Sequence, residues 1–150
     1  MSLQSRPMTI LMADDDPDDR FLVGEALTEA SVRTDFRTVE DGEKLMDYLR
    51  RQGKYADPEL SPRPNLILLD LNMPRKDGRE ALKEIKADPD LRQIPIVVLS
   101  TSQAPEDIFG SYDLGANSFA SKPGSYDGLH DLIETITKYW AGAVLLPGGH

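Results

Sequence analysis

The sequence has 150 residues, the length of one ordinary domain, and it contains no cysteine, which excludes disulfides and thiolate metal sites. Its 17 basic and 26 acidic residues leave a net charge of -9, which disfavours binding to the phosphate backbone of nucleic acids. No apolar run approaches the ~20 residues that span a bilayer, and no leader peptide opens the chain, so we expect a cytoplasmic protein without membrane contact.

The first predicted elements are a buried strand, a helix and an edge strand. Residues 10–13 form an unbroken apolar run, which is typical of a strand covered on both faces. A helix follows, because Asp16 and Pro17 are suited to the N-cap and the first helical position. Apolar residues then recur at helical spacing at Val23, Ala26, Leu27 and Ala30. Residues 33–39 are more polar and predict a strand at a sheet edge.

The rest of the chain repeats this alternation of strands and helices. The expected elements are a helix from near Asp41, a strand over 66–69, a helix with its apolar face over 78–85, a strand over 96–99, a helix from Pro105 to Leu114, a strand over 118–121 and a helix with an apolar stripe from Leu129 to Trp140. Five strands alternating with five helices predict an α/β fold with a doubly wound parallel sheet. Residues 53–64, rich in proline and polar side chains, are expected to form a surface insertion.

Polar residues follow the apolar strands. Asp14-Asp15-Asp16 follows the first, Asp70 the third, Ser100 the fourth and Lys122 the fifth. Because ligands of such folds bind outside the carboxyl ends of the strands, we expect one shared pocket. Crowded carboxylates require a compensating charge, and Mg²⁺ suits them because it prefers oxygen ligands and needs only one or two carboxylates. A cation beside a carboxylate, a hydroxyl and an ammonium can hold a phosphoryl group.

In their order and spacing, these residues resemble response-regulator receiver domains. The interval from Asp70 to Ser100 is 30 residues (100 − 70), and the interval from Ser100 to Lys122 is 22 (122 − 100), both typical of that family. The resemblance covers residues 8–140. It implies a flavodoxin-like (CheY-like) five-stranded sheet in the order 2-1-3-4-5, and a response regulator of a two-component system.

The resemblance also implies a role for each residue. Asp70 is expected to accept a phosphoryl group from a sensor histidine kinase, with Mg²⁺ as cofactor. Ser100 and Lys122 are expected to contact the phosphoryl oxygens, Ser100 and Phe119 to act as the switch, and the bond from Lys122 to Pro123 to be cis. The implied metal ligands are Asp14, Asp15, Asp70 and the backbone carbonyl of Asn72.

Simpler structural roles compete with several of these assignments. Asp16 is better suited to capping a helix than to binding a metal, and Asp14 also fits a position that stabilises a helix N-terminus. Phe119 alone would be an ordinary core residue. Thr101 and Ser102 compete with Ser100 for one role, and the family spacing favours Ser100.

A finer resemblance connects the chain to the small receivers paired with bacterial phytochrome kinases. It rests on the segment from Asp16 to Arg20, the long insertion, the segment 99–102, and the Lys138-Tyr139-Trp140 ending. Such receivers tend to dimerise through their C-terminal region, which implies a homodimer. The sequence differs from them in having aspartate at position 14, where glutamate is usual, and serine at position 100, where threonine is usual.

The C-terminal segment 141–150 forms an apolar tail with two possible roles, folding back onto its own domain or forming a dimer contact. Only 28 residues (150 − 122) follow Lys122, so we expect a receiver without a DNA-binding output domain. Its chemistry would be limited to its own phosphorylation and slow dephosphorylation.

Two other functions use similar residues. A phosphohydrolase of the haloacid-dehalogenase type also combines aspartates, Ser/Thr, Lys and Mg²⁺, but the expected Asp-x-Asp-Gly-Thr pattern is missing after the first strand. A degenerate receiver acting as a constitutive adaptor is the other alternative, and the complete set of site residues argues against it.

Overall fold

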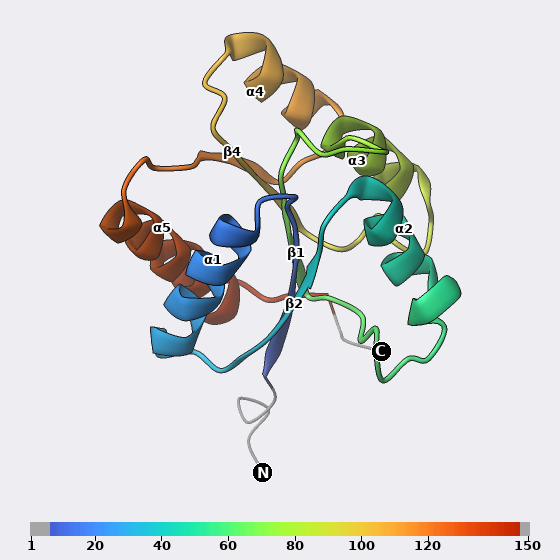
Figure 1. Ribbon diagram of the computed structural model, residues 1–150, viewed down its shortest axis with the longest axis horizontal. Coiled ribbons are helices and arrows are strands. Elements are labelled where there is room, and N and C mark those ends of the chain that lie inside the picture. The colour runs from blue at the N-terminus through green and yellow to red at the C-terminus, as the bar shows by residue number, and fades with distance from the viewer. Residues whose placement is uncertain (1–6, 148–150) are drawn as a thin grey trace.

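A computed structural model describes residues 7–147 and confirms the predicted fold class. Five parallel strands are hydrogen-bonded in the order β2-β1-β3-β4-β5 (Figure 1). They are β1 (Met8–Ala13), β2 (Thr34–Val39), β3 (Leu66–Leu69), β4 (Ile96–Ser100) and β5 (Ser118–Ser121). The two edge strands, β2 and β5, are the less apolar ones, as expected for strands that are less completely covered.

Helices cover both faces of the sheet, with α1 and α5 on one side and α2 and α3 on the other (Figure 1). The five α-helices are α1 (Pro17–Glu29), α2 (Gly42–Arg50), α3 (Gly78–Ala87), α4 (Pro105–Asp113) and α5 (Tyr126–Lys138). The helices α1, α2 and α4 begin where the sequence predicts. At the first two, the Asp16 carboxylate accepts a hydrogen bond from the Asp18 amide and the Asp41 carboxylate accepts one from the Lys44 amide.

The central strands are apolar on both faces because each face has its own core. Along β1, Leu11 and Ala13 join the cluster under α2 and α3, whereas Ile10 and Met12 join the cluster under α1 and α5. Burial of each large side chain contributes about 1.5–3 kcal/mol. The unbroken apolar runs therefore reflect two half-cores rather than one.

The insertion between α2 and β3 is anchored to the domain. It contains a short 3-10 helix, η2 (Gly53–Tyr55), and lies against the end of α2. The buried Tyr48 hydroxyl donates a 2.8 Å hydrogen bond to the Pro62 carbonyl, and the buried Ser61 hydroxyl donates one of 2.9 Å to the Tyr55 carbonyl. The first bond ties the insertion to α2, and the second joins its two halves.

The start of α3 packs tightly against the end of β3. The Gly78 amide donates a 2.8 Å hydrogen bond to the Leu71 carbonyl. A Cβ atom at Gly78 would lie 2.2 Å from the Asp70 carbonyl oxygen, so only glycine fits. This contact fixes the backbone of Asp70.

The described part of the tail is partly packed and partly exposed. A π-helical turn, η3 (Tyr139–Ala143), continues α5, and Trp140 and Leu146 pack against the cluster under α1 and α5. Tyr139 and Leu145 are exposed. The last three residues of the predicted tail, 148–150, lie outside the described range. Within residues 7–147, no helix has the length and apolar character to cross a membrane.

Candidate functional site

Three carboxylates meet at the carboxyl ends of β1 and β3, as predicted. Ala13 pairs with Leu69, so the residues that follow these two neighbouring strands emerge together. Oxygen atoms of Asp14, Asp15 and Asp70 all lie within 4.8 Å of one another. Asp14 and Asp70 are buried, whereas Asp15 is exposed.

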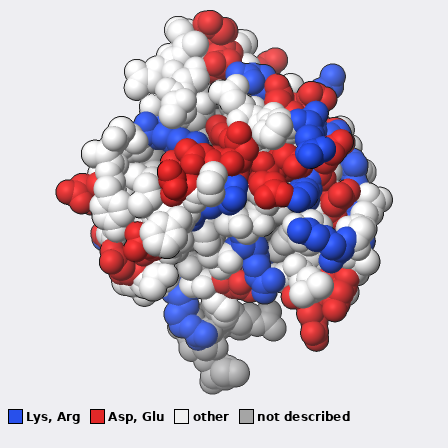
Figure 2. Space-filling model, in the orientation of Figure 1, with Lys and Arg blue, Asp and Glu red and all other residues white. Residues whose placement is uncertain are grey.

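The burial of these carboxylates opposes their ionisation. Burial, together with the charges of Asp14 and Asp15, raises the pKa of Asp70 to about 6, although the Lys122 ammonium opposes the shift. Burial also raises the pKa of Asp14, although a hydrogen bond from Lys122 opposes this. A hard divalent cation with oxygen ligands would relieve the repulsion, so these three residues fit a metal such as Mg²⁺ or Mn²⁺. Acidic side chains also form a band across the face seen in Figure 2, with basic side chains beside it.

Lys122 is the cation of the pocket. Its Nζ lies 2.7 Å from Asp14 Oδ2, 2.8 Å from Asp19 Oδ2 and 3.8 Å from Asp70 Oδ2. Burial alone lowers the pKa of Lys122, but its hydrogen bonds to Asp14 and Asp19, with the nearby acidic charges, outweigh this and raise the pKa. These neighbours therefore favour the charged form of the ammonium.

Asp19 is a site residue that the sequence analysis missed. It lies in the first turn of α1, three residues after the Asp16 cap, which brings it near the carboxyl end of β1. That spacing was the available signal, but the interaction depends on a lysine 103 residues away in sequence.

Ser100 is buried at the end of β4, in the position that the spacing predicts. Its hydroxyl accepts a 3.1 Å hydrogen bond from the Ser102 amide, and its carbonyl accepts one of 2.8 Å from the Lys122 amide. The hydroxyl of Ser102 instead donates to Asp107, and Thr101 is exposed. Of the three candidates, Ser100 alone is held next to the Lys122 backbone by such a bond.

A second feature that the sequence did not indicate is a hydrogen-bonded network beside this loop. The Ser102 hydroxyl donates a 2.6 Å hydrogen bond to Asp107 in α4. Arg79 in α3 donates one of 2.8 Å to the other Asp107 oxygen. The pKa of Asp107 is lowered mainly by these two hydrogen bonds and to a smaller extent by the Arg79 charge. The network connects α3, α4 and the loop after Ser100.

Phe119 and Asn72 are the two remaining residues with predicted roles. Phe119 in β5 is half-buried against the cluster under α2 and α3, and its amide donates a 3.1 Å hydrogen bond to the Tyr112 hydroxyl. The backbone amide of Asn72 hydrogen-bonds to the Asp70 carboxylate. A metal contact from the Asn72 carbonyl stays a prediction.

The expectation of a cis Lys122–Pro123 bond is wrong. No peptide bond between residues 7 and 147 is cis. The trans isomer of an X–Pro bond is intrinsically preferred by about 0.5–1 kcal/mol. With this bond in the trans form, the Lys122 ammonium still contacts Asp14 and Asp19.

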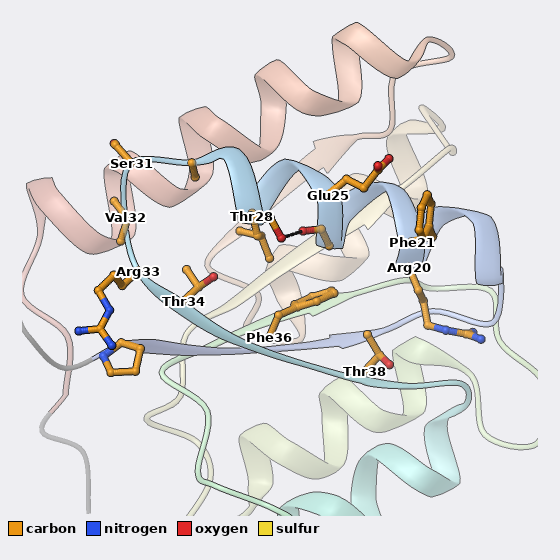
Figure 3. Close-up of a pocket in the computed structure, with 14 residues that line it drawn as sticks. Arg20, Phe21, Glu25, Thr28, Ser31, Val32, Arg33, Thr34, Phe36 and Thr38 are labelled. Carbon is orange, nitrogen blue, oxygen red and sulfur yellow. Dashed lines mark hydrogen bonds between the residues drawn. The ribbon is translucent and has the colours of Figure 1, made fainter.

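An open groove of about 910 Å³ lies away from this site, between α1 and β2. Figure 3 shows Phe36 of β2 beneath α1, with Arg20 and Phe21 at one end of the groove and Arg33 at the other. None of the predicted site residues lines it. The carboxylates and Lys122, rather than this groove, define the candidate site.

The comparison with protein families agrees with the fold. The model of the response regulator receiver domain matches residues 10–134. The chain belongs to the response regulator receiver domain family.

The chain is similar over almost its full length to response regulators of phytochrome signalling. It is 43% identical to response regulator Rcp1 of Synechocystis sp. over 141 residues, which cover 94% of each protein. The crystal structure of the phosphorylated cyanobacterial phytochrome response regulator RcpA has a TM-score of 0.90 at 44% identity, covering 95% of this chain and all of that one (100%). The Mn²⁺-bound form of Rcp1 has a TM-score of 0.87 at 43% identity, covering 95% of this chain and 100% of that one.

Proposed function

We propose that Asp70 is the phosphoacceptor of a two-component response regulator. The observation that carries this proposal is the pocket itself, where Asp70 lies 3.8 Å from the Lys122 ammonium and within 4.8 Å of the Asp14 and Asp15 carboxylates. The donor would be a phosphohistidine of a sensor histidine kinase. Membership of the receiver family favours this function over the phosphohydrolase alternative.

The transfer would replace one bond to phosphorus with another. A carboxylate oxygen of Asp70 attacks phosphorus while the bond to the histidine nitrogen breaks, and the imidazole leaves with the electron pair. Lys122 and the Ser100 hydroxyl stabilise the phosphoryl oxygens by hydrogen bonds. Asp14, Asp15 and Asp70 would hold Mg²⁺, which when bound neutralises charge on the transferred group. The similarity to the Mn²⁺-bound form of Rcp1 supports a divalent metal.

The phosphoacceptor assignment is tested by the Asp70→Asn variant. We expect it to abolish phosphorylation by acetyl phosphate with Mg²⁺, because the amide is not a nucleophile of comparable strength. Asp90→Asn, at an exposed aspartate after α3, is the matched control and should be phosphorylated normally. An unchanged phosphoprotein band for Asp70→Asn would refute the assignment.

We propose Ser100 and Phe119 as the switch that reads phosphorylation. Phosphorylated Asp70 offers new acceptor oxygens, and Ser100 moves toward them with its loop. Phe119, which is partly buried against the cluster under α2 and α3, would rotate into the space that the loop leaves. A shift from 1:99 to 99:1 requires about 5.5 kcal/mol, which a few charge-assisted hydrogen bonds supply.

We propose a phytochrome-type histidine kinase as the partner. The similarity of the chain to RcpA, a cyanobacterial phytochrome response regulator, and to the bacteriophytochrome response regulator AtBRR supports this choice. Phosphotransfer from such a kinase, compared with transfer from an unrelated histidine kinase, tests it. Equal rates from both would contradict it. The cytoplasmic location stays a prediction from composition.

We also propose that the chain forms a homodimer through its C-terminal region. Support comes from the tail and the two residues before it, where Tyr139 and Leu145 are exposed although Trp140 and Leu146 beside them are packed. Apolar and aromatic side chains of this kind are enriched in interface cores. The two roles predicted for the tail are thus compatible, because different side chains serve them.

A further inference from the structure

The ammonium of Lys122 has more acidic neighbours than it can bind closely. Two of its N–H groups are used in the short contacts to Asp14 and Asp19, of 2.7 and 2.8 Å. Asp70, at 3.8 Å, lies beyond hydrogen-bonding distance. The cation that should meet a phosphoryl group on Asp70 is therefore held on the α1 side of the pocket.

The two close partners differ in how readily they can release Lys122. The Asp14 side chain is 1% exposed and Asp19 is 24% exposed. Asp14 also accepts a hydrogen bond from the Asp16 amide, which fixes its carboxylate. A buried carboxylate that loses its cation is costly, whereas water replaces the lost bond at a partly exposed one. Asp19 is thus the partner that yields.

The position of Asp19 is set by the start of α1. The Asp16 cap and Pro17 define the first turn, and Asp19 follows in it. Asp18, its neighbour in the same turn, is exposed, and among the described residues its carboxylate makes no ion pair with Lys122. The two carboxylates therefore differ in one respect that matters, the bond to Lys122.

We propose that Asp19 is a positioning residue that competes with the phosphoryl group for Lys122. The inference rests on the proposed function of Asp70. In the unphosphorylated protein, Asp19 holds Lys122 away from Asp70. When the phosphoryl group arrives, Lys122 exchanges the Asp19 carboxylate for a phosphoryl oxygen, and water solvates Asp19. Asp19 thereby weakens the binding of the phosphoryl group and of its analogues.

The test is a titration of the full chain with beryllofluoride in the presence of Mg²⁺, followed by amide resonances. Asp19→Asn is expected to bind about fivefold more tightly than the wild type, the size of one partly exposed ion pair. Asp18→Asn makes the same change of charge and should stay within about twofold of the wild type. Asp19→Glu, which restores the carboxylate, should also stay within about twofold.

The outcomes separate this inference from the proposed function. If the wild type binds beryllofluoride and Asp19→Asn binds equally or more weakly, the competition is overturned while the acceptor role stands. A weaker affinity is what a merely structural role predicts. If the wild type binds none, the proposed function fails and the inference fails with it.

A measurement on the wild type avoids reliance on a variant that folds poorly. At saturation with beryllofluoride, the carboxyl carbon resonance of Asp19 is expected to shift as it loses Lys122, while that of Asp18 stays in place. An Asp19 resonance that does not move would contradict the exchange.

Discussion

At the scale of single residues, Gly78 determines where the Asp70 backbone lies. A Cβ at this position would meet the Asp70 carbonyl oxygen at 2.2 Å and Leu71 Cα at 2.7 Å, and neither backbone atom can move freely. We expect Gly78→Ala to lower the free energy of unfolding by about 1–3 kcal/mol, the usual cost of overpacking. Urea denaturation measures this.

Gly110 provides the control for that substitution. It lies inside α4, and a Cβ there would meet nothing within 4 Å. Gly110→Ala should raise the free energy of unfolding by about 0.5–1 kcal/mol, because alanine favours the helix. Equal effects of the two substitutions would show that the contact with Asp70 is unimportant.

Tyr48 is expected to make stability depend on pH in alkaline solution. Burial raises its pKa from 10.0 to about 12, so the folded state resists ionisation that the unfolded state accepts. Its stabilising contribution is complete below pH 10 and is lost as pH rises toward about 12. Urea denaturation across this range should show a fall in the free energy of unfolding.

The matched substitutions for this effect are Tyr48→Phe and Tyr139→Phe. The first should flatten the alkaline fall, because the buried hydroxyl is gone, and should cost the bond to Pro62 at every pH. Tyr139 is 52% exposed, so its substitution should leave the fall unchanged. An identical pH profile for Tyr48→Phe and the wild type would exclude Tyr48 as the cause.

The residues of the site were predictable to different degrees. Asp14, Asp15 and Asp70 could be placed together because each ends an apolar strand, and parallel strands bring such ends to one edge. Asp19 could not be placed there, because a helical aspartate is usually a solvated one. Its contact depends on how closely α1 approaches the residues after β5.

At the scale of elements, the loop between β4 and α4 is held by the network of Arg79, Asp107 and Ser102. We expect Asp107→Asn to speed amide exchange of Ser102 and Ala104 by about three- to tenfold, since their hydrogen bonds depend on this loop conformation. The free energy of unfolding should change little, because the ion pair is partly exposed.

Glu106→Gln is the control for this prediction. Glu106 is exposed in the same first turn of α4, and its substitution by glutamine removes the same charge. In this variant the amides of Ser102 and Ala104 should exchange at the wild-type rate. If both variants accelerate exchange equally, net charge rather than the network holds the loop.

The elements themselves were largely predictable, with differences at their ends. Strand β1 begins at Met8, two residues before the apolar run, because Thr9 is buried there and its amide donates a 2.9 Å hydrogen bond to the Asn65 side chain. The sequence around Thr9 does not indicate that its amide has a hydrogen-bond partner 56 residues away. Helix starts were clearer, since capping is local.

At the scale of the whole molecule, the proposed homodimer makes a testable prediction about Leu145. This side chain is 100% exposed, so Leu145→Glu should disturb a tail contact without affecting the fold. We expect sedimentation to show a shift from dimer to monomer. Leu60→Glu, at another exposed leucine within the insertion, should keep the wild-type mass. A dimeric Leu145→Glu would contradict the proposed contact.

The course of α5 separates the two ends of the molecule. The helix begins at Tyr126, four residues after Lys122, and its 13 residues extend about 20 Å to the far end of the sheet, where the tail starts (Figure 1). A second subunit joined at that end would leave both acceptor pockets facing outward. A paired molecule could then meet its kinase without first coming apart.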